Sequence, residues 1–153
     1  MNKKGFTLTE LLIVVAIIGV LAVIAIPAYI GQQKRAARTE ANSHLQTLRI
    51  LMEQNFAEQG SYTPPNNGAT APVSPLTYLG TSAVTNNGLE DFLRGFNPAG
   101  LDNAAQLDAL NYTYTMAFTA TTFTATATGK AGTRTEGDTC TINQSNTKTG
   151  PCW

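Results

Sequence analysis

Apolar residues follow three patterns in succession along the chain, and each pattern predicts a different kind of element. The first is a continuous run from Leu11 to Ile26, in which every residue is apolar or glycine. With its flanks the run covers residues 6–30, and 25 helical residues extend about 37 Å, enough to span a bilayer core of about 30 Å. Glu10 is the one charged residue in this range. The run therefore predicts a membrane-spanning helix with a carboxylate near one end.

An amphipathic pattern predicts that the helix continues through residues 31–59. Apolar residues recur at spacings of three and four, at Ala37, Ala41, Leu45, Leu48, Met52 and Phe56. This periodicity predicts one apolar helix face that covers a sheet. Ile50 lies off that face, and His44 lies at its border with no cluster of possible partners or ligands nearby in the sequence. We expect the helix to end near Gln59 and Gly60, because glycine suits a C-terminal cap.

Strict alternation of apolar and polar residues marks the C-terminal part of the chain. Residues 110–118 alternate over nine positions, and residues 122–128 repeat the pattern with threonine at every second position. A period of two predicts an antiparallel hairpin with one face on the long helix, and we expect a third strand over 139–143. Residues 61–88 are rich in Pro, Gly, Asn, Ser and Thr and predict a long surface connection, followed by a short helical turn within 89–96.

Composition and charge exclude several classes of function. Lysine and arginine total 10 and aspartate and glutamate total 10, which argues against a general nucleic-acid-binding surface. The single histidine cannot form a Cys/His cluster with zinc-like spacing, and no glycine-rich phosphate loop is present. We find no nucleophile–base pair or paired carboxylates in the sequence. It therefore predicts a protein that is not an enzyme and that has no cofactor and no metal site.

Two general interpretations of the N-terminus leave features unexplained. Lys3 and Lys4 supply the basic start of a secretory signal peptide, but the apolar run is too long and no A-x-A-like cleavage site follows it. A plain membrane anchor fits the length but gains nothing from a carboxylate, which costs about 2.5–3.5 kcal/mol at the centre of a spanning helix. Lys34, Arg35 and Arg38 lie beyond the run, so the positive-inside rule alone does not orient it. We expect this basic cluster to form a solvated or subunit-contacting helix face.

A third interpretation rests on a resemblance to a known family. Gly5 is followed by the residues FTLTE, then by LLIVVAIIG, with Pro27 beyond. A five-residue basic leader, a glycine, a phenylalanine, a spaced glutamate and a long apolar run closely resemble the N-terminus of type IV prepilins and of the pseudopilins of type II secretion and competence systems. The resemblance covers residues 1–30. It implies an α+β fold, in which a long N-terminal helix, apolar in its first half, packs on a small antiparallel sheet.

The resemblance also implies how the N-terminus is processed and used. A prepilin peptidase would remove residues 1–5 by cutting between Gly5 and Phe6, and the new amine of Phe6 would be N-methylated. Residues 6–30 would hold the subunit in the membrane and later form the filament core. Glu10 would then meet the Phe6 amine of an adjacent subunit. Because each charge is costly in an apolar core unless it is paired, the pair would set the register of assembly.

Two residues within the apolar helix predict a local weakness. Pro27 removes a backbone hydrogen bond and Gly19 lowers helix propensity eight residues earlier. We expect a helix break between them, as curvature or as melting after assembly. In lipid the freed carbonyls would lack partners, so melting is expected only in the filament.

The two cysteines predict a closed loop at the C-terminus. Cys140 and Cys152 enclose eleven residues, and in an exported domain a disulfide between them is permitted, with a stabilisation of about 3 kcal/mol in the chain-entropy model. Two reduced thiols are the alternative. The resemblance implies a C-terminal disulfide loop on the filament surface and a head that covers residues 60–153, with an αβ loop and an antiparallel sheet. Glu136 and Asp138 are too sparse for the calcium loop that the major pseudopilin generally carries.

The sequence thus predicts a structural pilin subunit of a type IV pilus that serves surface adhesion, twitching motility or DNA uptake. The alternatives are a type II secretion pseudopilin, a minor pilin, and a membrane-anchored binding module that would have no use for Glu10. The expected partners are other copies in a helical filament, the prepilin peptidase, inner-membrane assembly machinery and the membrane before assembly; nucleic acid remains open. We expect a single-pass subunit of the inner membrane that becomes part of an extracellular pilus on the cell surface.

Overall fold

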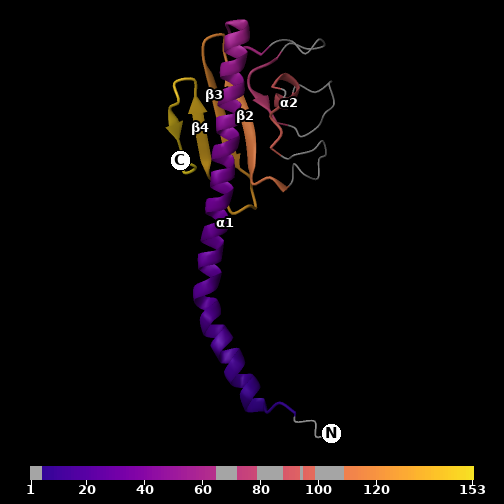
Figure 1. The fold of residues 1–153 in the computed structure, drawn as a ribbon, viewed down its shortest axis with the longest axis vertical. Helices are drawn as coiled ribbons and strands as arrows, with labels where there is room; N and C mark the ends of the chain where they lie inside the picture. Colours follow the sequence, from indigo (N-terminus) through magenta and orange to yellow (C-terminus); the bar gives the residue numbers. More distant parts are fainter. Residues whose placement is uncertain (1–4, 65–71, 79–87, 94, 99–108) are drawn as a thin grey trace. The chain divides into compact units, whose positions relative to one another are not determined.

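The structure is a computed structural model of the 153-residue chain that describes residues 5–64, 72–78, 88–93, 95–98 and 109–153. Its elements are α1 (Leu8–Gln59), β1 (Leu76–Thr77), α2 (Leu89–Phe92), β2 (Tyr112–Phe118), β3 (Phe123–Gly129), β4 (Thr139–Asn143) and β5 (Lys148–Thr149). They divide into two compact units, Met1–Ala36 and Ala37–Trp153. The predicted α+β class, with a long helix and a small antiparallel sheet, is confirmed (Figure 1).

Helix α1 has well-defined signals at both ends. It begins at Leu8 rather than at Phe6, because the side chain of Thr7 caps it, and it continues through Gly19 and Pro27. It ends at Gln59, as the sequence predicts. Gly60 follows with a φ of 69° and donates its N–H to Phe56 O at 2.8 Å, the bond expected of a left-handed C-terminal cap. The expected break between Gly19 and Pro27 stays a prediction for the assembled state.

The sheet has five strands in the order β1-β2-β3-β4-β5, and each pair is antiparallel. The predicted hairpin is confirmed, since β2 and β3 pair from Tyr112 with Gly129 to Phe118 with Phe123. Strand β4 has the predicted bounds. The two edge strands were not predicted, because two residues are too few to show a period of two. Strand β1 lies within the expected surface connection, of which residues 65–71 and 79–87 lie outside the described residues.

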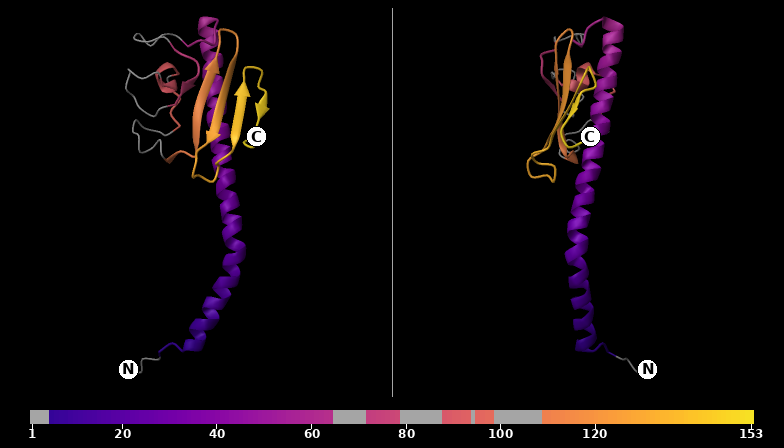
Figure 2. Two further views of the ribbon diagram at one scale, coloured as in Figure 1. Left: turned by 180° about the vertical axis from the view of Figure 1, so that it is seen from behind. Right: turned by 90° about the vertical axis from the view of Figure 1, so that its left-hand side faces the viewer.

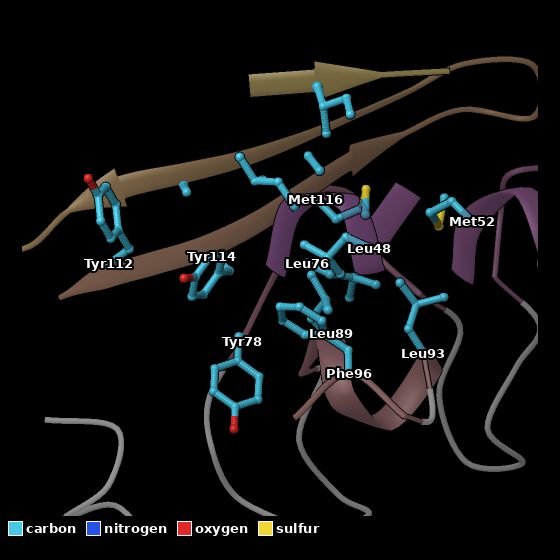
Figure 3. Close-up of a cluster of buried hydrophobic side chains, with 14 of the residues drawn as sticks. Leu48, Met52, Leu76, Tyr78, Leu89, Leu93, Phe96, Tyr112, Tyr114 and Met116 are labelled. Atoms are coloured by element: carbon cyan, nitrogen blue, oxygen red, sulfur yellow. The ribbon is translucent and has the colours of Figure 1, made fainter. Parts of the chain in front are cut away.

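The part of α1 from Ala37 onward covers one face of the sheet (Figure 2). The predicted apolar stripe is buried from Ala37 to Met52, whereas Ile50 is exposed, as expected. Phe56 is 39% exposed and stacks on Tyr62 with ring centroids 4.5 Å apart. The residues of the central strands that alternate toward the helix are buried: Tyr112, Tyr114, Met116, Phe118, Phe123, Ala125, Ala127, Cys140 and Ile142. Figure 3 shows how Leu48 and Met52 meet the side chains of β1, β2 and α2.

His44 has partners in the structure that its neighbours in the sequence do not reveal. Its Nδ1 lies 2.7 Å from the hydroxyl oxygen of Tyr114 in β2, and its ring is edge-on to Tyr114 and Phe96. His44 is half-buried, as expected of a residue at the border of the apolar stripe, but the sequence did not reveal its partner. The reason is distance along the chain, because Tyr114 lies 70 residues away.

This contact predicts a stability that depends on pH in the acidic range. Burial lowers the pKa of His44, and the charge of Glu40 opposes this shift in part. The pKa of His44 is about 6.5 in the unfolded chain and lower in the folded chain. The neutral imidazole therefore contributes its full stability above about pH 6.5, and this contribution is lost as the pH falls through the folded-state pKa. We expect the Tm of the full chain in detergent to fall as the pH drops below about 6.5. His44→Asn should lower the Tm at neutral pH and flatten this slope; an equal slope in both proteins would contradict the assignment.

Candidate functional site

The first candidate site is the apolar part of α1, whose side chains nothing covers within the described chain. Every large apolar residue from Phe6 to Ile30 is exposed, from 87% at Phe6 to 43% at Ile30. The helix is long and apolar enough to cross a membrane. Exposed apolar surface of this extent requires lipid or protein around it, since soluble monomers rarely present such patches. The segment is therefore suited to a lipid bilayer or to the interior of an assembly.

Thr7 and Glu10 form a reciprocal capping box at the start of α1. Oε2 of Glu10 accepts hydrogen bonds from the N–H of Thr7 at 2.9 Å and from its hydroxyl at 2.7 Å, while the N–H of Glu10 donates to Thr7 Oγ1 at 3.2 Å. These bonds satisfy backbone donors that a helix start leaves without partners. This role of Thr7 was not predicted, although a threonine three residues before a glutamate and an apolar run is the sequence signature of a capping box.

Phe6 and Glu10 lie at the same end of the helix, but the capping box holds only Glu10 in place. Phe6 precedes the cap, lies outside the helix and is exposed, whereas Glu10 is fixed by Thr7. Both bonds from Thr7 end on Oε2 of Glu10, so the second carboxylate oxygen can accept a bond from another chain. The arrangement can thus present a fixed negative charge beside an accessible residue 6.

One face of the same helix carries a shallow apolar groove. It is lined by Ala16, Ile17, Val20 and Leu21, which lie one helical turn apart in pairs. The small Ala16 side chain leaves room between its larger neighbours, so an apolar side chain from another molecule could pack there. The groove has no polar residue in its lining and is suited to apolar contacts alone.

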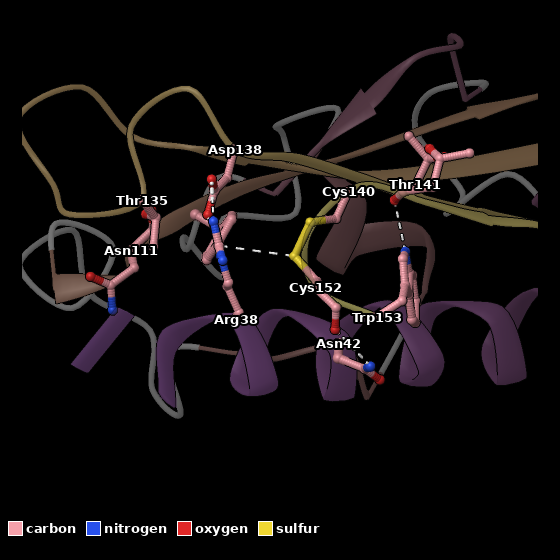
Figure 4. Close-up of a disulfide and its surroundings, with 11 residues drawn as sticks. Arg38, Asn42, Asn111, Thr135, Asp138, Cys140, Thr141, Cys152 and Trp153 are labelled. Carbon is pink, nitrogen blue, oxygen red and sulfur yellow. Dashed lines mark hydrogen bonds and ion pairs between the residues drawn. A yellow bond between two sulfur atoms is a disulfide. The ribbon is translucent and has the colours of Figure 1, made fainter. Parts of the chain in front are cut away.

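The second candidate site is the loop closed by the disulfide between Cys140 and Cys152 (Figure 4). The two Cα atoms are 6.0 Å apart, and both residues are buried. Asn42 of α1 donates its side-chain N–H to the carbonyl oxygen of Cys152 at 3.0 Å. The disulfide therefore holds the C-terminus against β4, and the asparagine holds it against the helix.

The outer part of this loop is exposed, and contacts with Trp153 hold it in place. Trp153 donates its Nε1–H to the carbonyl oxygen of Thr149 at 2.7 Å, and Lys148 Nζ lies 4.7 Å from the centre of the Trp153 ring. A cation over an indole face is attracted by the ring quadrupole. The loop thus presents a fixed aromatic and cationic surface near the C-terminus.

Arg38 does not belong to a solvated basic face, and this part of the prediction is wrong. Its guanidinium binds both carboxylate oxygens of Asp138, at 2.8 and 2.9 Å (Figure 4). Tyr112 donates its hydroxyl to the same carboxylate at 3.1 Å. The hydrogen bond to Asp138 raises the pKa of Arg38. Burial, followed by the bond to Asp138, raises the pKa of Tyr112 to about 12. The acidic residue that looked too isolated for a calcium loop instead joins α1 to the β3–β4 connection.

Loss of this carboxylate should destabilise the head. Asp138→Asn removes the charge that Arg38 and Tyr112 share, and we expect the free energy of unfolding to fall by about 1–3 kcal/mol. The loss is no larger because Arg38 is partly exposed, so that water can replace part of its interaction with Asp138. Glu136→Gln changes the same charge two residues away at an exposed position and serves as the control. Chemical denaturation of the full chain in detergent measures both. Equal losses in the two variants would show that the ion pair is not what stabilises this connection.

Comparisons with known proteins bear on the N-terminal site most directly. Residues 1–26 match the family model described as the prokaryotic N-terminal methylation motif. The chain is 48% identical over 62 residues to a type IV major pilin protein of Myxococcus xanthus, which is 40% of this chain and 28% of that protein. It is 38% identical over 87 residues to a type IV major fimbrial protein of Dichelobacter nodosus, 56% of this chain and 54% of the relative.

A third relative has a comparable match. The type IV wide pilus major component of Thermus thermophilus is 44% identical over 62 residues, 40% of this chain and 47% of that protein. The chain thus spans between about a quarter and about a half of the length of these curated relatives. No solved structure matches the chain. The resemblance that residues 1–30 indicate is confirmed, and the relatives carry the names of pilus and fimbrial components rather than of enzymes.

Proposed function

We propose that this chain is a type IV pilin, a structural subunit that assembles with copies of itself into a type IV pilus. One observation carries the proposal: the apolar side chains of residues 8–30 are exposed along a helix that starts at a fixed carboxylate. A membrane anchor would require the apolar surface alone. A filament subunit requires both the apolar surface and the carboxylate. The same helix leaves the lipid bilayer for a protein core, and in that core the charge of the carboxylate can be paired.

The N-terminus supports processing between Gly5 and Phe6. The match to the N-terminal methylation motif covers both residues, and Phe6 lies outside α1, where an enzyme can reach the preceding peptide bond. We propose that a prepilin peptidase removes residues 1–5 and that the amine of Phe6 is then methylated. Since α1 begins at Leu8, the cut would not disturb the capped start of the helix.

Glu10 is proposed to receive the Phe6 amine of an adjacent subunit. Thr7 occupies one carboxylate oxygen of Glu10, so the incoming amine can approach a carboxylate whose position is already fixed. Both charges lose water in an apolar core and become tolerable when they meet. Subunits in another register would leave each charge unpaired. The pair would therefore select the register, and the apolar surface would supply the affinity.

The remaining features of α1 support packing in a filament core. The groove at Ala16, Ile17, Val20 and Leu21 would receive an apolar side chain of a neighbouring subunit. Helix curvature or melting between Gly19 and Pro27 would let the packed segments adjust, because proline leaves a carbonyl without its usual donor. The helix would remain intact in lipid, where that carbonyl has fewer alternative partners.

We propose that the subunit first spans the inner membrane and is then transferred by inner-membrane assembly machinery to a pilus on the cell surface. The disulfide of the head suits a domain that folds outside the reducing cytosol. Surface adhesion, twitching motility and DNA uptake are the roles proposed for the filament. A deletion strain assayed separately for attachment, colony spreading and transformation would distinguish among them.

The test of pilin function is the composition of sheared surface filaments. We expect mass spectrometry of such filaments to identify this chain as the repeating subunit, with an N-terminus at methylated Phe6 and an intact disulfide between Cys140 and Cys152. Cells that lack the gene for this chain should lose the filaments, and the gene supplied in trans should restore them. A chain in the filaments that still begins at Met1 would contradict the processing scheme, and filaments without this chain would contradict the function.

A further inference from the structure

The face of the sheet turned away from α1 is composed almost entirely of threonine. We call it the threonine face. Within the described strands it consists of nine threonines, one alanine and one asparagine: Thr77, Thr113, Thr115, Ala117, Thr124, Thr126, Thr128, Thr139, Thr141, Asn143 and Thr149. The alternating partners of these residues in β2, β3 and β4 are buried against the helix, and none of the eleven is buried. The face is thus accessible in the single chain.

Strand register places these threonines in straight rows across the sheet. The central row crosses all five strands and joins Thr77, Thr115, Thr126, Thr141 and Thr149, each directly opposite the next. A second row joins Thr113, Thr128 and Thr139. Adjacent strands lie about 4.8 Å apart and alternate residues about 6.7 Å apart, so the rows form a regular grid of equal side chains. The result is a surface on which equal side chains repeat at regular intervals.

The threonine face carries no charged side chain among the residues that the structure describes. Lys148 in β5 lies opposite the buried Ile142 and therefore belongs to the other face. Lys130, Arg134 and Glu136 lie in the β3–β4 connection, outside the strands. Solvated sheet surfaces and edges usually carry charges that oppose association with other sheets. This face lacks that protection.

Threonine hydroxyls can bind a copy of themselves, which charged groups cannot do. Each hydroxyl is both a donor and an acceptor. The chain already contains such pairs, at 2.7 Å between Thr141 and Thr149 on this face and at 2.8 Å between Thr119 and Thr122 in the β2–β3 turn. The branched side chain also has few rotamers to lose when it is immobilised. A face of this composition is complementary to an identical face.

We propose that the threonine face is a self-association surface whose partner is the same face on a second copy of this chain in a neighbouring filament. The inference rests on the proposed pilin function, because a filament repeats a weak contact many times and raises its combined strength. With α1 in the filament core, the face turned away from α1 is the one that meets other filaments. An uncharged partner surface also means that lateral association should be insensitive to salt.

The test places a charge at the centre of the face. Thr126 lies in the middle strand and in the central row, so a two-fold contact between identical faces brings it close to its own copy. Thr126→Lys should lower the bundled fraction of purified filaments, measured by electron microscopy and low-speed sedimentation, by at least about tenfold at low salt. Thr126→Glu should do the same. A mixture of the two filament preparations should bundle again, and these mixed bundles should dissolve in high salt.

Thr121→Lys is the matched control, because Thr121 is an exposed residue of the β2–β3 turn outside the face and the net charge changes equally. Its filaments should bundle like those of the wild type. Equal bundling of the Thr126→Lys filaments, equal loss in the control, or failure of the mixture to recover would each overturn the proposal. Recovery in the mixture also shows that both variants fold and assemble.

A second measurement separates this proposal from the proposed function. The full chain in mild detergent is examined by sedimentation velocity, as wild type, as each Thr126 variant and as their mixture. Because a single contact is weak, we expect self-association of the wild type only at high concentration, none for either variant alone, and hetero-association of the mixture. If cells form no filaments that contain this chain, the pilin function is wrong. The measurement in detergent would still show whether the threonine face associates with its own copy. Wild-type protein that remains monomeric at high concentration, although its filaments form, would overturn the face proposal alone.

Discussion

Glu10→Val should leave the chain in the membrane and remove it from filaments. The substitution leaves residues 6–30 without a charged side chain, so insertion becomes easier, while the proposed partner of the Phe6 amine is lost. An amine left unpaired in an apolar core carries a penalty of several kcal/mol, and each 1.4 kcal/mol is a factor of ten in an equilibrium constant. We therefore expect filament yield to fall by at least about a hundredfold. Immunoblots of the membrane fraction and of sheared filaments measure the two pools.

Two further variants separate the charge of Glu10 from its capping role. Thr7→Val removes the hydroxyl that binds the carboxylate but leaves the charge, so it should weaken assembly less than Glu10→Val does. Thr9→Val makes the same substitution two residues away and should leave filament yield unchanged. Normal yield from Glu10→Val would refute the pairing. A loss in Thr7→Val as complete as that in Glu10→Val would show that the capped helix start, rather than the charge, is what assembly requires.

Removal of the disulfide should produce the largest loss of head stability. Cys140→Ala combined with Cys152→Ala opens a loop with a sequence separation of 12, and we expect the free energy of unfolding to fall by about 3 kcal/mol. The loss arises because the unfolded chain gains freedom when the loop is no longer closed. Denaturant titration of the full chain in detergent, followed by circular dichroism, measures the change. An unchanged midpoint would mean that the rest of the head orders the C-terminus without the bond.

The position of the only tryptophan provides a local readout of the same variant. Trp153 is the single tryptophan of the chain, and it follows the second cysteine directly. When the bond is absent, Trp153 should leave the carbonyl of Thr149 and become more solvated, with a red-shifted emission. A reducing agent should reproduce the shift in the wild type and have no effect on the double alanine variant. A shift in the reduced alanine variant would point to some other effect of the reagent.

The sequence predicts those parts of the fold that depend on local periodicity. The strands from Tyr112 to Asn143 and the apolar stripe of α1 repeat every two or every three to four residues, and each lies where its pattern places it. The two-residue strands β1 and β5 were missed because they exist through pairing with a neighbouring strand and not through their own pattern. Periodicity records which face of an element is buried, but not which element covers it.

The polar contacts of the head could not be predicted for a related reason. Arg38 and Asp138 are 100 residues apart, and His44 and Tyr114 are 70 residues apart, so no local pattern links them. Each residue alone fitted a simpler interpretation as a solvated charge or a border residue. The capping box of Thr7 and Glu10 is different, since its three-residue spacing is visible in the sequence. The family resemblance predicted a role for the charge of Glu10 but did not predict the local hydrogen bonds that hold its carboxylate in place.

The placing of these polar contacts along α1 has a mechanical consequence. A pulling force on a filament would reach each head through α1 and would pass into the sheet as shear. Arg38, Asn42 and His44 lie on the first turns of the helix within the head, and they bind the β3–β4 connection, the C-terminus and β2 respectively. The load would thus be divided among three separate parts of the head before it reaches the buried apolar residues further along. A filament whose subunits lack Asp138 should begin to deform at a lower tension, even where its shape without load is unchanged.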